Sequence, residues 1–353
     1  MSLTTTPAVS FGSRLLLLLL CVLTVFALVS LSGCGPRDHT LDLVGRTMGT
    51  SWSVQVPRPP AGLDDAALYE RISAELASVN ERMSTYQADS ELSRFNVAET
   101  TDWFPVSAEL VRLTDTALAV STLTNGAFDV TVGPLVNLWG FGPEVKADQL
   151  PSQAEIDAAR ARVGWDLLHT RVEPPALRKD RTDLYVDLSA IAKGYGVDRM
   201  AAVLEDVGIT DYLVEIGGEL RGRGRNAEGE PWRIAIERPD AGRRAVLRVV
   251  ALTDRAMATS GDYRNFFELE GQRYSHTIDP ATGRPVDHQL ASVTVLAERC
   301  AEADAWATAL LVLGPARGMT VANERGLIAL FVERFGDELR VTESTAFAQM
   351  AGG

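Results

Sequence analysis

The spacing of apolar residues along the chain predicts several helices. Within residues 64–83, the residues Ile72, Leu76, Val79 and Met83 recur three or four apart, which places them on one face of a helix. Similar patterns, some of them closed by glycine, predict further helices over residues 107–122, 153–164, 189–205 and 301–313. Each of these helices is expected to bury its apolar face.

Alternation of apolar and polar residues predicts strands between these helices. TSWSVQV at 50–56 and LYVDL at 184–188 alternate in this way. Helices and strands mix without strict alternation. We therefore expect an α+β fold, with mixed or antiparallel sheets and packed helices, rather than a doubly wound one. Other strands are expected at 212–216, 232–239, 292–297, 327–333 and 338–344, with one or two more within 245–261.

The first 33 residues are expected to be a targeting signal rather than part of the fold. Residues 15–31 form an apolar run of 17, which suits the core of a signal peptide and is the short limit for a transmembrane helix. The following residues, Leu31-Ser32-Gly33-Cys34, resemble the lipobox of bacterial lipoproteins. This resemblance implies cleavage before Cys34 and lipidation of that cysteine, which would anchor the chain to a membrane.

The chain is accordingly divided into a lipoprotein signal peptide at 1–33, a tether at 34–44 and a folded domain at 45–348. The domain is long enough for one large unit or two intimately packed lobes. The anchor would hold it on the outer side of the inner membrane or in the outer membrane, facing the periplasm. Cys300 is then the one cysteine of the folded part, so we expect no disulfide within it.

The charge of the chain limits its partners. A formal net charge of −13 argues against nucleic acid as the main partner, because binding to phosphates depends on local positive charge. A phosphorylated small molecule would need cations, a helix N-terminus or a metal ion around it.

Two segments could approach a ligand closely. Asp129 stands between apolar residues that are flanked by Gly126 and Gly133, although an ordinary transition from loop to strand would look the same. Asp187 ends a predicted strand, Ser189 is placed to cap the next helix, and Lys193 follows one turn later. A helix N-terminus with a lysine can bind an anion, but a simple capped helix is the alternative.

Two further segments offer groups for proton transfer and metal binding. His276 precedes the turn-rich stretch 277–286, and an imidazole with its ordinary pKa near 6.5 suits proton transfer at neutral pH; a hydrogen-bonded turn residue is the alternative. Asp304 and Thr308 are four apart on a predicted helix and share a face. Their oxygens suit Mg²⁺ or Ca²⁺ rather than zinc. A hydrogen bond from Thr308 to the Asp304 carbonyl would need no metal.

Taken in order, these segments resemble the ApbE family of flavin transferases over nearly all of the chain after the signal. The motifs that carry the resemblance are Met48-Gly49-Thr50, Met83-Ser84-Thr85-Tyr86, Ser90-Glu91-Leu92-Ser93-Arg94-Phe95-Asn96, Ala127-Phe128-Asp129, Val186-Asp187-Leu188-Ser189, Glu215-Ile216-Gly217-Gly218, Ser260-Gly261-Asp262-Tyr263, His276-Thr277-Ile278-Asp279-Pro280 and Asp304-Ala305-Trp306-Ala307-Thr308-Ala309.

The resemblance implies an activity and a set of partners. Members of this family bind FAD and Mg²⁺ and transfer FMN from FAD to a threonine hydroxyl of a target protein, with release of AMP. Their targets are flavin subunits of membrane redox complexes, such as sodium-pumping NADH:quinone reductase. The resemblance also implies an FAD site in a cleft between two packed lobes.

The resemblance assigns roles to residues of this chain. The backbone carbonyl of Ala190, with Asp304 and Thr308, matches the metal shell. His276 is our candidate for the base that accepts the threonine proton, and Asp187 is the rival. The residues that match FAD contacts are Met48, Tyr86, Ala127, Phe128, Asp129, Asp187, Lys193 and Ile278.

Two other functions remain open at this stage. One is a Mg²⁺-dependent FAD pyrophosphatase that uses water as the acceptor and yields FMN and AMP. The other is a non-catalytic lipoprotein that binds a flavin. The hydrolase would share the metal and FAD pockets of the transferase, whereas loss of the Asp304 and Thr308 pair would mark the non-catalytic protein.

Overall fold

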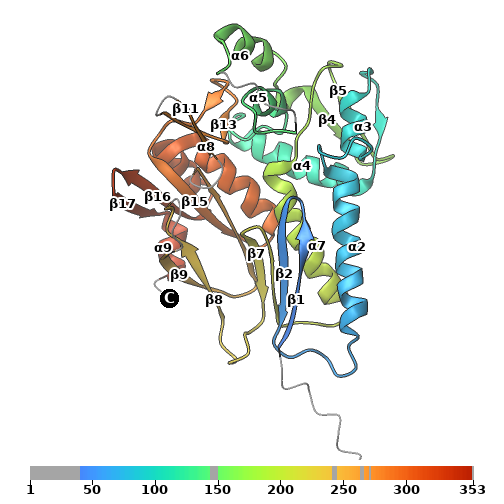
Figure 1. Ribbon diagram of the computed structural model, residues 1–353, viewed down its shortest axis with the longest axis vertical. Helices are drawn as coiled ribbons and strands as arrows, with labels where there is room; N and C mark the ends of the chain where they lie inside the picture. Colours follow the sequence, from blue (N-terminus) through green and yellow to red (C-terminus); the bar gives the residue numbers. More distant parts are fainter. Residues whose placement is uncertain (1–39, 144–149, 241–244, 263–265, 270–271, 352–353) are drawn as a thin grey trace, which may run out of the picture.

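A single antiparallel sheet of eight strands forms the centre of the molecule. The computed structural model describes residues 40–143, 150–240, 245–262, 266–269 and 272–351. Every neighbouring pair of strands in the sheet is antiparallel (Figure 1). In spatial order the strands are β1 (Leu41–Thr47), β2 (Thr50–Val56), β6 (Tyr212–Ile216), β7 (Glu219–Arg223), β10 (Arg255–Gly261), β15 (Leu290–Ala297), β16 (Ile328–Phe335) and β17 (Glu338–Glu343).

Three long helices cover one face of this sheet. They are α8 (Cys300–Glu324), α7 (Ser189–Asp206) and α2 (Asp65–Met83), which follow one another from left to right in Figure 1. Helix α8 lies on β10 and β15, and α7 packs against both other helices. The approach of α7 to α8 is close at Gly194, where a Cβ atom would overlap the carbonyl of Cys300. Glycine at this position therefore brings the two helices together.

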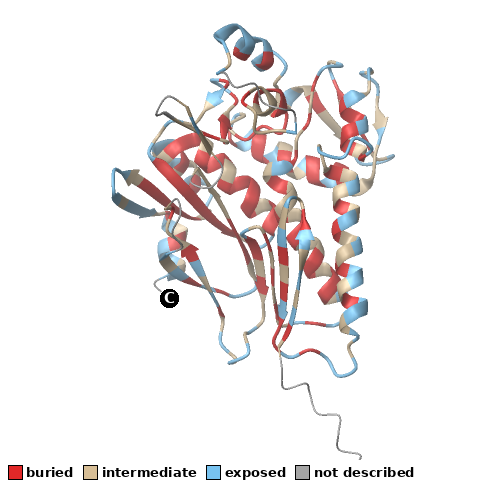
Figure 2. Ribbon diagram, viewed as in Figure 1, coloured by how far each residue is buried: buried red, intermediate tan, exposed pale blue. Residues whose placement is uncertain are grey.

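The opposite face of the sheet is covered over β7, β10, β15 and β16. Strands β8 (Trp232–Glu237) and β9 (Val246–Leu252) form a separate two-stranded sheet, and α9 (Thr345–Ala351) follows β17. Figure 2 shows buried residues concentrated along the central strands and the inward sides of α7 and α8. The cluster on the covered face contains Leu220, Trp232, Ile236, Val250, Leu252, Met257, Leu296, Leu330, Val332 and Phe347.

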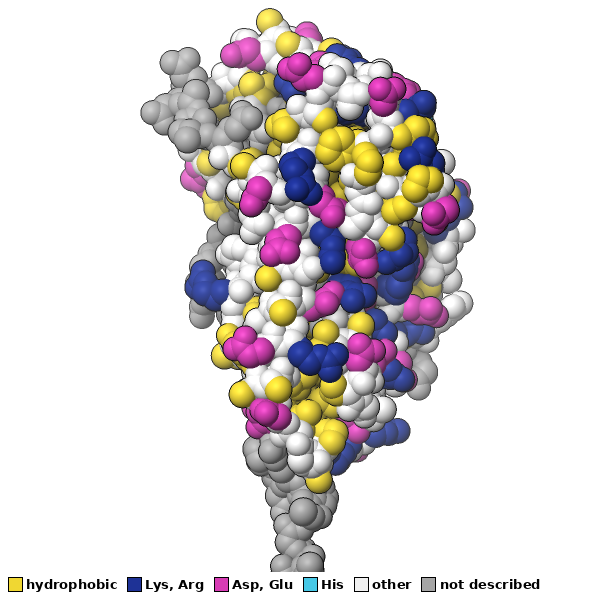
Figure 3. Space-filling model, turned by 90° about the vertical axis from the view of Figure 1, so that its right-hand side faces the viewer, with side chains coloured by type: hydrophobic (Ala, Val, Ile, Leu, Met, Phe, Trp, Pro, Cys, Tyr) yellow, Lys and Arg dark blue, Asp and Glu magenta, His cyan; other side chains and the backbone are white. Residues whose placement is uncertain are grey.

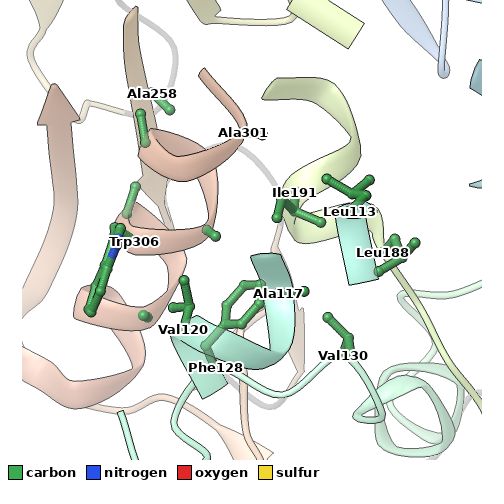
Figure 4. Close-up of a cluster of buried hydrophobic side chains, with 14 of the residues drawn as sticks. Leu113, Ala117, Val120, Phe128, Val130, Leu188, Ile191, Ala258, Ala301 and Trp306 are labelled. Atoms are coloured by element: carbon green, nitrogen blue, oxygen red, sulfur yellow. The ribbon is translucent and has the colours of Figure 1, made fainter. Parts of the chain in front are cut away.

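Shorter elements gather at one end of the sheet, drawn at the top of Figure 1. Helix α4 (Ala108–Leu123) packs there against α7 and α8, and apolar residues of all three helices meet in one cluster (Figure 4). The others are α3 (Glu91–Val97), β3 (Phe104–Pro105), α5 (Gly133–Leu138), α6 (Gln153–Arg160), η1 (Trp165–Leu167), β4 (Leu168–Arg171), β5 (Ala176–Lys179), β11 (Phe266–Leu269), β12 (Gln272–Ser275), β13 (Ile278–Asp279) and β14 (Arg284–Pro285).

Side chains of both charge signs lie next to one another on the surface shown in Figure 3. Helix α2 carries ion pairs of this kind: Glu75 pairs with Arg199 at 2.7 Å, and Arg71 pairs with Asp206 at 3.7 Å. Such exposed pairs contribute little to stability individually.

Three expectations from the sequence need correction. The fold begins at Leu41 rather than at residue 45, because β1 pairs with β2 along its whole length. The predicted strand at 184–188 is wrong: the segment is alternately buried, but among the described residues no strand pairs with it. Helix α8 runs on past residue 313, although Gly314 has non-helical angles and Pro315 follows it, so the predicted stop is a kink.

The α+β fold and the other predicted helices are confirmed, with ends that differ by a few residues. The apolar run 15–31 and Cys34 lie outside the described residues. Within the described part of the chain, no helix combines the length and the apolar character needed to cross a bilayer.

Candidate functional site

A cleft of about 920 Å³ opens where the β1–β2 turn, the start of α7, the start of β7 and the first half of α8 meet. Every residue that the sequence assigns to FAD, to the metal or to proton transfer lines this cleft. They are Met48, Tyr86, Ala127, Phe128, Asp129, Asp187, Ala190, Lys193, His276, Ile278, Asp304 and Thr308. The fold thus brings together residues that lie up to 260 positions apart.

The turn that carries Met48 has an unusual backbone. Met48 and Gly49 connect β1 to β2, and their φ angles are +47° and +73°. A two-residue hairpin loop with both φ angles positive favours asparagine, aspartate or glycine, not methionine. The Met48 side chain reaches α7, since a Cβ placed on Gly196 would lie 3.1 Å from its Cε. This turn thus places Met48 in the wall of the cleft with its side chain against α7.

Asp129 projects from a loop whose other side chains are anchored in the core. Its neighbours Phe128 and Val130 are buried and belong to the apolar cluster of Figure 4. The Asp129 carboxylate accepts hydrogen bonds from the Thr131 N–H at 2.7 Å, the Thr131 hydroxyl at 2.6 Å and the Trp165 N–H at 3.2 Å. Burial nevertheless raises the pKa of Asp129 to about 6.

Asp187 orders the start of α7. Its Oδ1 accepts the backbone N–H of Ser189 at 2.8 Å and the Ser189 hydroxyl at 2.6 Å. Ser189 is therefore not the N-cap that the sequence predicted. It is the first residue of α7, and the carboxylate of Asp187 accepts its backbone N–H. Partial burial and the charge of Asp187 raise the pKa of Tyr86, which stays a protonated donor at neutral pH.

Lys193 makes a buried ion pair that the sequence did not predict. Its Nζ lies 2.7 Å from Oε2 of Glu219, at the start of β7, and Glu219 is 3% exposed. Burial disfavours the Lys193 ammonium, but Glu219 and Asp304 outweigh burial and raise the pKa of Lys193. Glu219 directly follows the motif Glu215-Ile216-Gly217-Gly218. A glutamate after two glycines is therefore the sequence feature that could have pointed to this ion pair.

Asp304 and Thr308 face the cleft from α8. Asp304 is 3% exposed, and its Oδ2 accepts the backbone N–H of Gly194 at 3.0 Å. Burial, and then the charge of Glu219, raise the pKa of Asp304 to about 7. The Thr308 hydroxyl bonds to the Ser260 hydroxyl at 2.9 Å, rather than to the carbonyl one turn back. Both side chains are held by neighbouring elements and not by their own helix.

His276 stands between β12 and β13, at the edge of the same cleft. Its ring lies 6.3 Å from the ring of Phe141. The following turn is closed by hydrogen bonds from Val286 N–H to the Thr277 carbonyl at 3.0 Å and from Gly283 N–H to the Asp279 carbonyl at 2.8 Å. The segment 277–286 is thus a tight hairpin directly after His276.

Comparison with known proteins identifies the family. Residues 48–331 match the model of the ApbE family. The chain belongs to the ApbE family. A curated ApbE relative from Vibrio cholerae, named FAD:protein FMN transferase, is 46% identical over 321 residues, which cover 91% of this chain and 96% of the relative. A protein of the same name from Escherichia coli K12 is 45% identical over 312 residues, covering 86% and 87% of the two chains.

Solved ApbE structures agree with this fold. The flavin transferase ApbE from Vibrio cholerae has a TM-score of 0.82 at 44% identity, covering 88% of this chain and 99% of that one. The apo form of the flavinyl transferase ApbE from Pseudomonas stutzeri has a TM-score of 0.81 at 39% identity, covering 89% and 97%.

Proposed function

We propose that this ApbE protein transfers FMN from FAD to a threonine hydroxyl of a target protein, with Mg²⁺, and releases AMP. The observation that carries the proposal is the cleft, which gathers every residue matched to FAD, metal and base. The names of relatives near 45% identity, aligned over most of the chain, support the same activity.

The residues of the cleft suit an anionic nucleotide only with added positive charge. Lys193 is a cation that lines the cleft, but its charge is shared with Glu219. Asp129, Asp187 and Asp304 line the same space. A dianionic diphosphate would therefore be repelled unless a metal ion accompanied it.

The oxygen donors near Asp304 fit Mg²⁺. Asp304 offers one carboxylate oxygen beyond the one bonded to Gly194, and Thr308 and Ala190, which line the same cleft, could add a hydroxyl and a carbonyl oxygen. Among the described residues, no three His, Cys, Asp or Glu side chains converge as a metal cage. Few protein ligands, completed by phosphate oxygens, are typical of Mg²⁺ sites. A bound Mg²⁺ would offset charge on the diphosphate and on the phosphoryl group in transfer.

His276 is the proposed base. The threonine hydroxyl gives its proton to an imidazole nitrogen, its oxygen forms a bond to the FMN phosphorus, and the bond from that phosphorus to the AMP oxygen breaks. Asp187 remains the rival, but its Oδ1 already accepts two hydrogen bonds from Ser189.

Mass spectrometry of a threonine-containing acceptor segment, incubated with FAD and Mg²⁺, tests the proposal. The expected result is FMN attached to the threonine, with one AMP released per attachment, and none on a segment with alanine in its place. Free FMN and AMP, even with saturating acceptor, would show the FAD pyrophosphatase instead. FAD binding with no product would show the non-catalytic flavin-binding protein.

Two variants test the assigned roles in the same assay. His276→Asn should keep FAD binding and lose about 10²–10⁴-fold in transfer rate. Asp304→Ala should lose turnover while remaining folded, and Thr308→Ala should be milder because a hydroxyl carries no charge. Wild-type transfer by His276→Asn would make Asp187 the leading base, and wild-type activity of Asp304→Ala at low Mg²⁺ would place the metal elsewhere.

The proposed setting is a membrane surface facing the periplasm, with the chain anchored through lipid on Cys34. Flavin subunits of membrane redox complexes, such as sodium-pumping NADH:quinone reductase, are the proposed targets. Metabolic labelling with palmitate should mark the wild-type chain and not Cys34→Ala. Labelling of the variant at the wild-type level would remove the anchor from the proposal.

A further inference from the structure

The segment that carries Asp187 into the cleft is held by one buried asparagine. Val186 precedes Asp187 and has no strand beside it in the described part of the chain. Instead, the Val186 N–H donates to Oδ1 of Asn96 at 2.8 Å, and the Val186 carbonyl accepts from Nδ2 of Asn96 at 2.8 Å. On the next residue, the Asp187 N–H donates to the Val130 carbonyl at 2.7 Å. The backbone around Asp187 is thus fixed from two sides.

An asparagine amide is suited to this task. It offers one donor and one acceptor in a plane, as the edge of a β-strand does, and so can satisfy both polar groups of one residue. An aspartate would keep the acceptor but turn a second oxygen toward the Val186 carbonyl. Asn96 is 9% exposed, so water could not easily replace a lost bond.

Asn96 is itself held by a buried lysine. The Lys179 ammonium, on β5, donates to the Phe95 carbonyl at 3.1 Å and to the Asn96 carbonyl at 2.9 Å. Both carbonyls belong to the last turn of α3, where the Phe95 carbonyl also accepts the Ala98 N–H at 3.2 Å. Lys179 is 0% exposed, and its ammonium donates to these two backbone carbonyls. A lysine buried in this way serves the end of α3 rather than the surface.

We propose that Asn96 is a positioning residue for Asp187 and that Lys179 holds Asn96 in place. The proposal rests on the proposed function, because it assumes that Asp187 contacts FAD. Asp187 orders Ser189, so an error at Val186 would also move the first turn of α7, which includes Ala190. Neither Asn96 nor Lys179 lines the cleft, which gives them an indirect role.

A double-mutant cycle on FAD affinity tests the proposal. Asn96→Asp should weaken FAD binding about tenfold, the scale of one buried hydrogen bond lost. In the background of Asp187→Asn the same change should have little further effect, because the residue it positions is already altered. Equal losses in both backgrounds would overturn the proposal. Asn323→Asp is the matched control, since Asn323 also binds a backbone N–H, that of Thr345, but lies at the far end of α8.

Hydrogen exchange provides a readout that does not depend on FAD. In Asn96→Asp, amide exchange should rise in a peptide covering residues 184–190 and stay unchanged in peptides from β15 and β16. Unchanged exchange at 184–190 would overturn the positioning role, whether or not the protein transfers FMN. If wild type shows neither FAD binding nor transfer, the proposed function falls while the exchange result still decides this inference.

Lys179→Met serves as a second variant if Asn96→Asp fails to fold. It leaves the Asn96 amide intact and removes only the ammonium at the end of α3. The same local rise in exchange at 184–190 is expected, together with weaker FAD binding that depends on Asp187. A variant with wild-type exchange and affinity would show that Lys179 has no part in positioning.

Discussion

At the scale of single residues, several groups of the cleft are held in costly states. Met48 occupies a left-handed conformation, and Asp129, Glu219 and Asp304 are buried carboxyls with raised pKa values. The resemblance of motifs could assign most of these residues, because each motif is local in the sequence. Glu219 was missed because its importance depends on Lys193, which lies 26 positions earlier on another element.

Met48 offers a test of stability against function. Asparagine adopts positive φ more easily than alanine, so Met48→Asn should leave the apo protein about 1 kcal/mol more stable than Met48→Ala, which loses the same packing on α7. The same change removes an apolar side chain from the cleft and should weaken FAD binding. Urea unfolding and flavin fluorescence titration would measure the two effects. Met48→Leu is the control that keeps both the strained turn and an apolar side chain, and equal FAD affinity in wild type and Met48→Asn would contradict the argument.

Asp129 should make the stability of the apo protein depend on pH. The unfolded carboxyl loses its proton near pH 3.8, whereas the folded one keeps it until about pH 6. The folded state therefore binds more protons in this window, and the free energy of unfolding falls as pH rises from about 4 to 6, by on the order of 3 kcal/mol for this group.

The comparison that isolates this effect is Asp129→Asn. Urea unfolding at pH 4, 5, 6 and 7 should show wild type losing stability relative to Asp129→Asn up to pH 6, with no further change above. Asp102→Asn, at an exposed carboxyl, should show no such trend. A constant difference between wild type and Asp129→Asn across this range would mean that Asp129 titrates normally.

At the scale of elements, contacts with residues distant in the sequence determine whether a segment forms a strand, and the local pattern of residues does not. The alternation of LYVDL at 184–188 correctly predicts which side chains are buried, since Leu184, Val186 and Leu188 are buried. It predicted a strand because burial with a period of two is the signature of a strand. Whether such a segment joins a sheet depends on whether another strand lies beside it. Here the side chain of Asn96 and the backbone carbonyl of Val130 bind its backbone groups instead.

Helix α8 illustrates positioning by another element. Arg299 precedes it without a side-chain cap, and the carboxylate of Asp198, on α7, accepts the N–H groups of Cys300 at 2.9 Å and Ala301 at 3.0 Å. Since α7 also carries Lys193 and α8 carries Asp304, this clamp sets these two residues of the cleft against each other. A cap supplied by another helix has no local signal in the sequence.

Loss of the Asp198 clamp should affect both stability and the cleft. Asp198→Ala should lower the free energy of unfolding by about 2 kcal/mol, because two helix amides lose a charged acceptor. It should also weaken Mg²⁺-dependent FAD binding. Asp64→Ala removes the cap of α2, which comes from the adjacent residue, and should cost about 1 kcal/mol with FAD binding intact. Equal FAD affinity in the two variants would show that the clamp stabilises the fold without setting the cleft.

At the scale of the whole molecule, the sequence predicted the α+β class but not the first edge of the sheet. Residues 41–44 of β1 were assigned to the tether, and Gly45 is a residue type that is depleted in strands. The structure explains the glycine: Gly45 lies opposite Trp52 on β2, and a Cβ there would lie 2.5 Å from the indole ring. The tryptophan lies over the glycine of its neighbour strand, so this glycine is a packing feature of an edge strand.

The start of the fold can be tested by truncation. A chain beginning at residue 40 should fold and bind FAD as well as the longer protein, because it retains all of β1. A chain beginning at residue 45 loses Leu41, which is 6% exposed, and the pairing of residues 41–44 with residues 53–56 of β2. Burial of that leucine and its neighbours is worth about 3 kcal/mol, so thermal unfolding should begin roughly 5–10 °C lower. FAD affinity should fall as well, since the shortened strand supports the Met48 turn less firmly. Equal melting temperatures and FAD affinities for the two chains would show that residues 41–44 act as a tether and not as part of the fold.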